Sequence, residues 1–158
     1  MTVITRSLKS FGAALLLTAL AAFSAPAQAL PHGFYVANQG YDFMEFRKTE
    51  RGRVTVILQE YRMDGRNFSR IVREVAEANG SSSCTKMKDT TPIGGPRFHC
   101  QYNLDRTPYT LHLIPYYEDG FVLSVVIYGD NYPGFGITYD DVRDLIRYWF
   151  RYRKPGHP

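Results

Sequence analysis

The sequence is poor in cysteine, in net charge and in long apolar runs. It has two cysteines and one tryptophan among 158 residues, and its formal net charge at pH 7 is +4. No apolar stretch reaches the roughly 20 residues that a membrane-spanning helix needs, so we predict no transmembrane segment in the mature chain. The small excess of positive charge gives no basis for a nucleic-acid partner, and we predict none.

Signature motifs of common enzyme classes are also missing. The chain contains no Gly-x-Ser-x-Gly, no Gly-x-x-x-x-Gly-Lys, no His-Glu-x-x-His and no glycine-rich dinucleotide motif. Ser83 and Lys86 have the Ser-x-x-Lys spacing of penicillin-recognising enzymes, but the Ser-Asp-Asn and Lys-Thr-Gly motifs of those enzymes are absent. The sequence therefore predicts no catalytic residue, no metal site and no cofactor.

The N-terminal segment has the three-part pattern of a secretory signal peptide. Two basic residues precede an apolar run at 11–23, and Ala27 and Ala29 form a small-x-small cleavage site. We expect cleavage of residues 1–29, which leaves 30–158 as a single mature α+β domain. The expected compartment is the periplasm, with full secretion as the alternative.

Cys84 and Cys100 have no third thiol to compete with them. In an oxidising compartment a lone pair of cysteines most simply forms one disulfide, and we predict it here. The alternative is a pair of buried free thiols. The predicted bond closes a loop that is rich in proline and glycine and has no apolar periodicity of its own.

Apolar periodicity predicts five strands and two helices. Alternating and β-branched runs predict strands at 41–48, 53–61, 97–104, 109–116 and 121–128. Helical spacing predicts one helix at 67–79 and a second that starts at Thr138. Residues 30–40 are expected to be an irregular entry segment. The order β-β-α-β-β-β-α favours an α+β fold in which both helices pack on an antiparallel sheet of about five strands.

His99 and His112 are the candidate acid–base residues. If Leu104 pairs with Tyr109 across the intervening turn, Gln101 lies opposite His112, and His99 lies one step along on the same face. Diagonal neighbours of this kind are about 7–8 Å apart, close enough to act with a carboxylate or to share a metal. A zinc site needs three or four ligands, and the sequence provides no third, so we expect two polar residues on a half-exposed sheet face.

Aromatic and basic residues near the C-terminus are the candidate partner-binding residues. Tyr132 and Phe135 lie on a loop rich in glycine and proline, where they can either anchor a partner or fold back over the sheet. Arg151 and Arg153 end the last predicted helix, where they can either form a charged rim or complement the helix dipole.

Export, small size, a disulfide and the absence of catalytic motifs favour a non-enzymatic exported binding protein. We expect a periplasmic inhibitor, an immunity-type protein or an envelope accessory protein that acts on a protein partner in the cell envelope. One alternative is a small hydrolase of a cell-wall or surface polymer that uses His99 or His112 with a carboxylate. Another is a carrier of a small ligand.

Overall fold

The computed structural model describes residues 29–49, 53–89, 91–129, 132–134 and 136–153. Apart from Ala29, the predicted signal peptide lies outside these residues, so its cleavage stays a prediction. The described ranges form seven strands and two helices. In chain order they are β1 (Phe34–Gln39), β2 (Phe43–Lys48), β3 (Val54–Arg62), α1 (Phe68–Ala78), β4 (Cys84–Lys86), β5 (Arg97–Gln101), β6 (Pro108–Tyr116), β7 (Phe121–Tyr128) and α2 (Tyr139–Tyr152).

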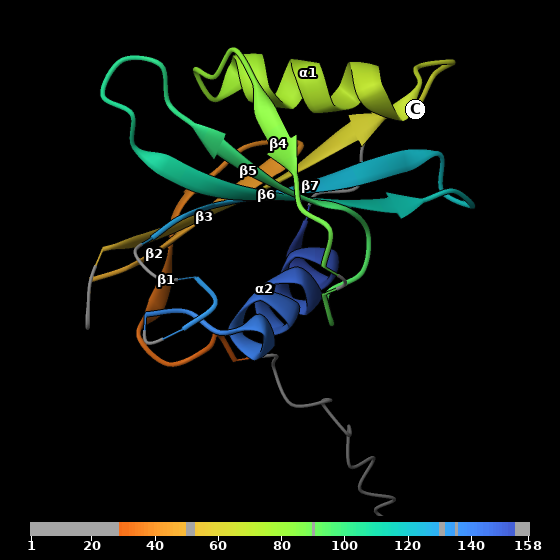
Figure 1. The fold of residues 1–158 in the computed structure, drawn as a ribbon. Coiled ribbons are helices and arrows are strands. Elements are labelled where there is room, and N and C mark those ends of the chain that lie inside the picture. The colour runs from red at the N-terminus through yellow and green to blue at the C-terminus, as the bar shows by residue number, and fades with distance from the viewer. Residues whose placement is uncertain (1–28, 50–52, 90, 130–131, 135, 154–158) are drawn as a thin grey trace, which may run out of the picture.

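The seven strands form one sheet in the order β1-β2-β3-β7-β6-β5-β4. Every neighbouring pair in this sheet is antiparallel. Two consecutive meanders, β1–β3 and β4–β7, meet at the centre of the sheet, where β3 pairs with β7. Figure 1 shows α1 on one side of the sheet and α2 on the other. The fold is therefore a three-layer α+β arrangement of helix, sheet and helix.

Helix α1 forms where the sequence predicts it. Its apolar spacing places Ile71 and Val75 on one buried face. At its start the side-chain oxygen of Asn67 accepts a hydrogen bond from the backbone N–H of Arg70 at 2.9 Å, which satisfies a donor that the helix leaves unpaired. Beyond its end Gly80 has a φ of 66°, a left-handed conformation that glycine adopts without a Cβ clash.

Helix α2 begins at a capping box, as the sequence predicts. The Thr138 hydroxyl accepts from the backbone N–H of Asp141 at 3.2 Å, and the Asp141 carboxylate accepts from the backbone N–H of Thr138 at 2.8 Å. The apolar stripe of the helix is buried; it consists of Val142, Leu145, Ile146 and Trp149.

The two faces of the sheet carry separate cores that share the central strand β7. Leu123, Val125 and Ile127 belong to the core under α2. Val122 and Val126, which alternate with them, belong to the core under α1. A strand covered on both faces needs apolar side chains at successive positions, which accounts for the unbroken apolar run that marks β7 in the sequence.

The predicted strand count and element order are wrong in two places, because the observed order is β-β-β-α-β-β-β-β-α. Strand β1 forms inside the expected entry segment 30–40. It is an edge strand with one buried residue, Phe34, and its register shifts between Val36 and Asn38, so it lacks the alternation that reveals a strand. Strand β4 is three residues long and forms the opposite edge.

The predicted disulfide is confirmed. Cys84 and Cys100 are joined and lie directly opposite each other on β4 and β5. The bond crosses the last strand pair of the sheet and holds the short edge strand β4 against β5.

Candidate functional site

Each helix covers only part of its sheet face. The core under α2 takes most of its strand residues from β1, β2, β3 and β7. The core under α1 takes most of its strand residues from β5, β6 and β7. Two areas of the sheet therefore lie outside the main cores: the outer strands β4 and β5 on the α2 side, and the outer strands β1 and β2 on the α1 side.

The open area on the α2 side contains a hollow of about 380 Å³. The strand register places Thr85 opposite His99, and His99 opposite Thr110, on the face that carries Ile127 of the α2 core. The hollow, which we call the β4–β5 hollow, is lined by side chains that are all polar and include no carboxylate. They are Ser82, Ser83, Thr85, His99, Gln101, Tyr102, Asn103 and Arg106.

The walls of the β4–β5 hollow are fixed by covalent and hydrogen bonds. The Cys84–Cys100 disulfide joins the two strands. Ahead of β4, the backbone N–H and the hydroxyl of Ser82 both donate to the side-chain oxygen of Asn103, at 3.1 and 3.0 Å. The backbone N–H of Asn103 donates in turn to the carbonyl of Gly80 at 2.8 Å. These bonds fix the backbone around the hollow and the side chains of Ser82 and Asn103 before any ligand binds, which lowers the entropy cost of binding.

Arg106 has an unusual backbone conformation for a residue that lines a hollow. Its φ of 62° lies in the left-handed region, which few residues other than glycine adopt. The loop is held by two hydrogen bonds, from the N–H of Arg106 to the carbonyl of Tyr102 and from the N–H of Tyr102 to the carbonyl of Thr107, both 2.9 Å. A left-handed residue here closes the loop between β5 and β6 and so fixes the point from which the Arg106 side chain leaves the backbone.

A buried polar cluster lies on the same sheet face, beyond His99. The Nε2 atom of His112, whose side chain is fully buried, is 3.0 Å from the Tyr132 hydroxyl. Arg97 lies opposite His112, donates to the Tyr139 hydroxyl at 3.3 Å and forms an ion pair with Asp89. These contacts attach the loop before α2 to the sheet.

The environment of His112 favours its neutral form. Burial, with the positive charge of Arg97 as a second cause, lowers the pKa of His112 from 6.5 to about 4, although the charge of Asp89 acts in the opposite direction. Burial also raises the pKa of Tyr132. A neutral imidazole hydrogen-bonded to a neutral phenol carries no net charge. The pair can therefore be buried without removing a charge from water, which suits a structural role.

The predicted register of the two histidines is wrong, but their relation on the sheet is confirmed. Cys100, and not Leu104, pairs with Tyr109, because residues 102–107 form a closed loop where a tight turn was expected. His99 and His112 are still diagonal neighbours on one face. They differ in environment, since His99 is exposed in the β4–β5 hollow and His112 is buried.

The structure separates the predicted partner-binding residues. Tyr132 folds back, with its ring against His112 and Tyr139. The Arg153 guanidinium lies over the Trp149 ring, 4.6 Å from its centre, and pairs with Glu60 at 2.7 Å. Arg151 is exposed in the last turn of α2, with its guanidinium 5.8 Å from the centre of the Tyr152 ring. Phe135 lies outside the described residues.

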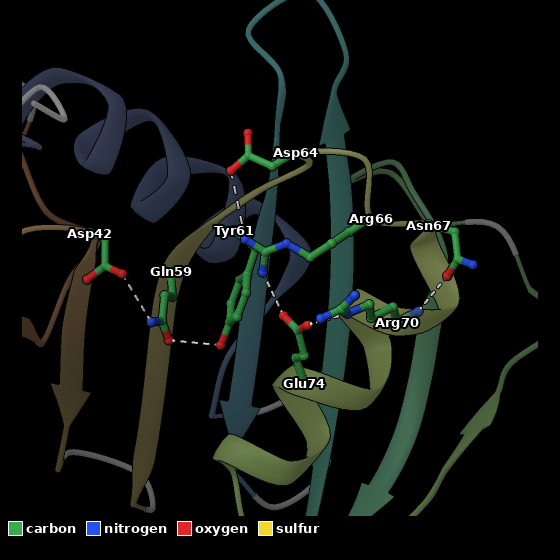
Figure 2. Close-up of polar contacts among 8 residues, drawn as sticks. All are labelled: Asp42, Gln59, Tyr61, Asp64, Arg66, Asn67, Arg70 and Glu74. Atoms are coloured by element: carbon green, nitrogen blue, oxygen red, sulfur yellow. Dashed lines mark hydrogen bonds and ion pairs between the residues drawn. The ribbon is translucent and has the colours of Figure 1, made fainter. Parts of the chain in front are cut away.

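A second polar surface borders α1, on the other side of the sheet. Figure 2 shows Glu74 of α1 between Arg66 and Arg70, and both ion pairs are short, at 2.7 and 3.0 Å. On β3, the Tyr61 hydroxyl donates to Gln59 at 3.1 Å, and burial raises the pKa of Tyr61 to about 12. Because these charged and polar groups bind one another, this surface has fewer groups left for a ligand than the β4–β5 hollow.

Sequence reasoning identified His99 as a candidate but missed the residues around it. The hollow depends on the β5–β6 register and on the backbone of Arg106, neither of which periodicity reveals. The available signal was local: the run of serines at 81–83 precedes β4 and the loop at 102–107 follows β5, so both lie at the same end of the disulfide-linked antiparallel pair.

The described residues include no group of three or more His, Cys, Asp and Glu side chains placed to hold a metal ion. No helix within the described ranges is both long enough and apolar enough to cross a membrane. Comparison with known protein families, with curated proteins and with solved structures gave no match to this chain.

Proposed function

We propose that this chain is an exported, non-enzymatic binding protein of the periplasm, and that the β4–β5 hollow is where it recognises a protein partner in the cell envelope. The observation that carries the proposal is a hollow of about 380 Å³ lined by polar side chains, with a backbone fixed by the disulfide and by hydrogen bonds. That volume lies within the range of about 300–1,000 Å³ that ligand pockets occupy, and it accommodates a side chain or a group of similar size.

The chemistry of the lining supports binding over catalysis. The lining contains one imidazole and no carboxylate, so it lacks the paired acid and base of a hydrolase. His112, the second histidine of the hydrolase alternative, is buried and bonded to Tyr132. The carboxylate that influences it, that of Asp89, is already paired with Arg97.

Filling the hollow tests the proposal. Ser83 is exposed in the lining, so Ser83→Trp places an indole there without disturbing a core. Ser69→Trp is the matched control, because Ser69 is exposed on α1, on the other side of the sheet. Disulfide-intact wild-type protein and both variants are used as bait for envelope extracts at low and high salt, and bound species are identified by mass.

We expect one stoichiometric partner to bind the wild type and the Ser69→Trp variant and to be lost with Ser83→Trp. Equal capture by all three proteins would place the interface elsewhere on the molecule. Absence of any partner with the wild type would contradict a protein-binding role.

A further inference from the structure

The lining of the β4–β5 hollow has more hydrogen-bond donors than acceptors. The side-chain oxygen of Asn103 accepts two hydrogen bonds from Ser82, and these bonds occupy both lone pairs of that oxygen. Its NH₂ group is therefore the part of the amide left for a ligand. Arg106 adds a guanidinium that can donate but cannot accept, and the hydroxyls of Ser83 and Thr85 can orient to donate.

The charge of the hollow is positive. Arg106 is its permanently charged lining residue, and it takes part in none of the ion pairs formed within the described residues. Asp105, the carboxylate next to Arg106 in the sequence, is not part of the lining and accepts a hydrogen bond from the backbone N–H of Thr107 at 2.9 Å.

We propose that the group recognised in the β4–β5 hollow is an oxyanion, a carboxylate, phosphate or sulfate, bound by the Arg106 guanidinium together with the Asn103 amide and the Thr85 hydroxyl. This inference rests on the proposed function and specifies its ligand chemistry. A guanidinium presents paired donors that match the oxygen spacing of such anions, and charge-assisted hydrogen bonds are roughly twice as strong as neutral ones. A neutral polyol can accept hydrogen bonds from the guanidinium, but it has no negative charge to pair with it.

The left-handed backbone at Arg106 provides a test that separates binding from folding. Asparagine tolerates positive φ better than most residues, so Arg106→Asn removes the charge and keeps the loop conformation. Arg73→Asn is the matched control, because Arg73 is exposed on α1 and its loss changes the net charge equally. Thr85→Val removes one donor and adds no charge.

The experiment titrates the disulfide-intact protein with sodium phosphate, sodium sulfate, sodium acetate and, as a neutral probe, glucose, at constant ionic strength. Amide chemical shifts report binding residue by residue. We expect saturable shifts at Thr85, His99 and Asn103 with at least one anion. We also expect affinity about tenfold lower in Arg106→Asn and unchanged in Arg73→Asn. The anion that binds most tightly identifies the source of the oxyanion: acetate favours an acidic side chain of a protein partner, whereas phosphate or sulfate favours a modified partner.

Three results would overturn the inference. Saturation by glucose with no response to the anions would show a polyol site and reject the oxyanion, and the Ser83→Trp capture experiment would then decide separately whether the hollow binds a protein. Anion-induced shifts that are equal in wild type and Arg106→Asn would show that the anions bind elsewhere. Partner capture that is abolished by Ser83→Trp, together with no anion response, would likewise retain the function and reject the oxyanion.

Discussion

At the scale of the residue, His112 couples the stability of the fold to pH. Its pKa is about 4 in the folded chain, compared with 6.5 in the unfolded chain. Between these values the unfolded chain binds a proton that the folded chain does not, so stability falls as the pH is lowered through this window. The full loss, reached once the pH is below the folded pKa of about 4, is roughly 3 kcal/mol from this group.

Urea unfolding of wild type and His112→Gln at pH 7, 5.5 and 4 tests this coupling. We expect the difference in unfolding free energy between the two proteins to shrink as the pH falls, because glutamine does not titrate. A difference that is constant over this range would mean that His112 is protonated to the same extent in the folded and unfolded chains.

Arg153 is a second residue whose role the structure specifies. Its guanidinium lies over the Trp149 ring and pairs with Glu60 at a half-buried site, so it contributes both a cation–π contact and an ion pair. We expect Arg153→Ala to lower the free energy of unfolding by about 1–2 kcal/mol. Arg147→Ala is the control, because the ion pair of Arg147 with Asp144 is largely exposed and contributes about 0.5 kcal/mol or less. If thermal or urea unfolding shows equally small losses of stability for both variants, the contacts of Arg153 stabilise the fold no more than an exposed ion pair does.

At the scale of the element, the disulfide compensates for the shortness of β4. Three residues of edge strand have few ladder hydrogen bonds, and the Cys84–Cys100 bond closes a loop with a sequence separation of 16. In the chain-entropy model a loop near this length gives about 3 kcal/mol. We therefore expect the double variant Cys84→Ser, Cys100→Ser to lose about 2–4 kcal/mol in urea unfolding.

The same variant has a local consequence that hydrogen exchange can detect. Without the bond, the β4 and β5 amides next to the β4–β5 hollow should exchange faster than those of the β3–β7 pair. Unchanged protection of β4 would mean that hydrogen bonds alone hold this edge.

Elements with a strong periodic pattern were predictable from the sequence, and elements held by their neighbours were not. Helix α2 has both a cap and an apolar stripe, and β7 has an apolar run, so both were found where they lie. Strand β1 has one buried residue and a register shift, and β4 is held by a disulfide. The candidate site follows the same division, since His99 was identifiable by residue type, whereas the position of Arg106 in the lining depends on a backbone conformation that periodicity does not encode.

At the scale of the whole molecule, the two cores are joined through shared strands. Strand β7 contributes alternate residues to the core under α2 and to the core under α1, and it pairs with β3 along its length. A loss of packing on one face therefore removes support from strands that the other face also needs. The chain should unfold as one cooperative unit rather than as two half-domains.

Leu145→Ala tests this coupling from the α2 side. Leu145 is fully buried, and removing its side chain should lower the unfolding free energy by about 2–5 kcal/mol. Native-state hydrogen exchange then reads the two faces separately. We expect the most protected amides of α1 to lose as much protection free energy as those of α2, although α1 lies on the opposite side of the sheet. Arg143→Ala is the control, because Arg143 is exposed on the same helix. It should leave the protection free energies of the α1 and α2 amides within about 0.5 kcal/mol of wild type. Loss of protection confined to α2 and its own core would show that the α1 core is stable without it, and the shared strand β7 would then be a boundary between two units.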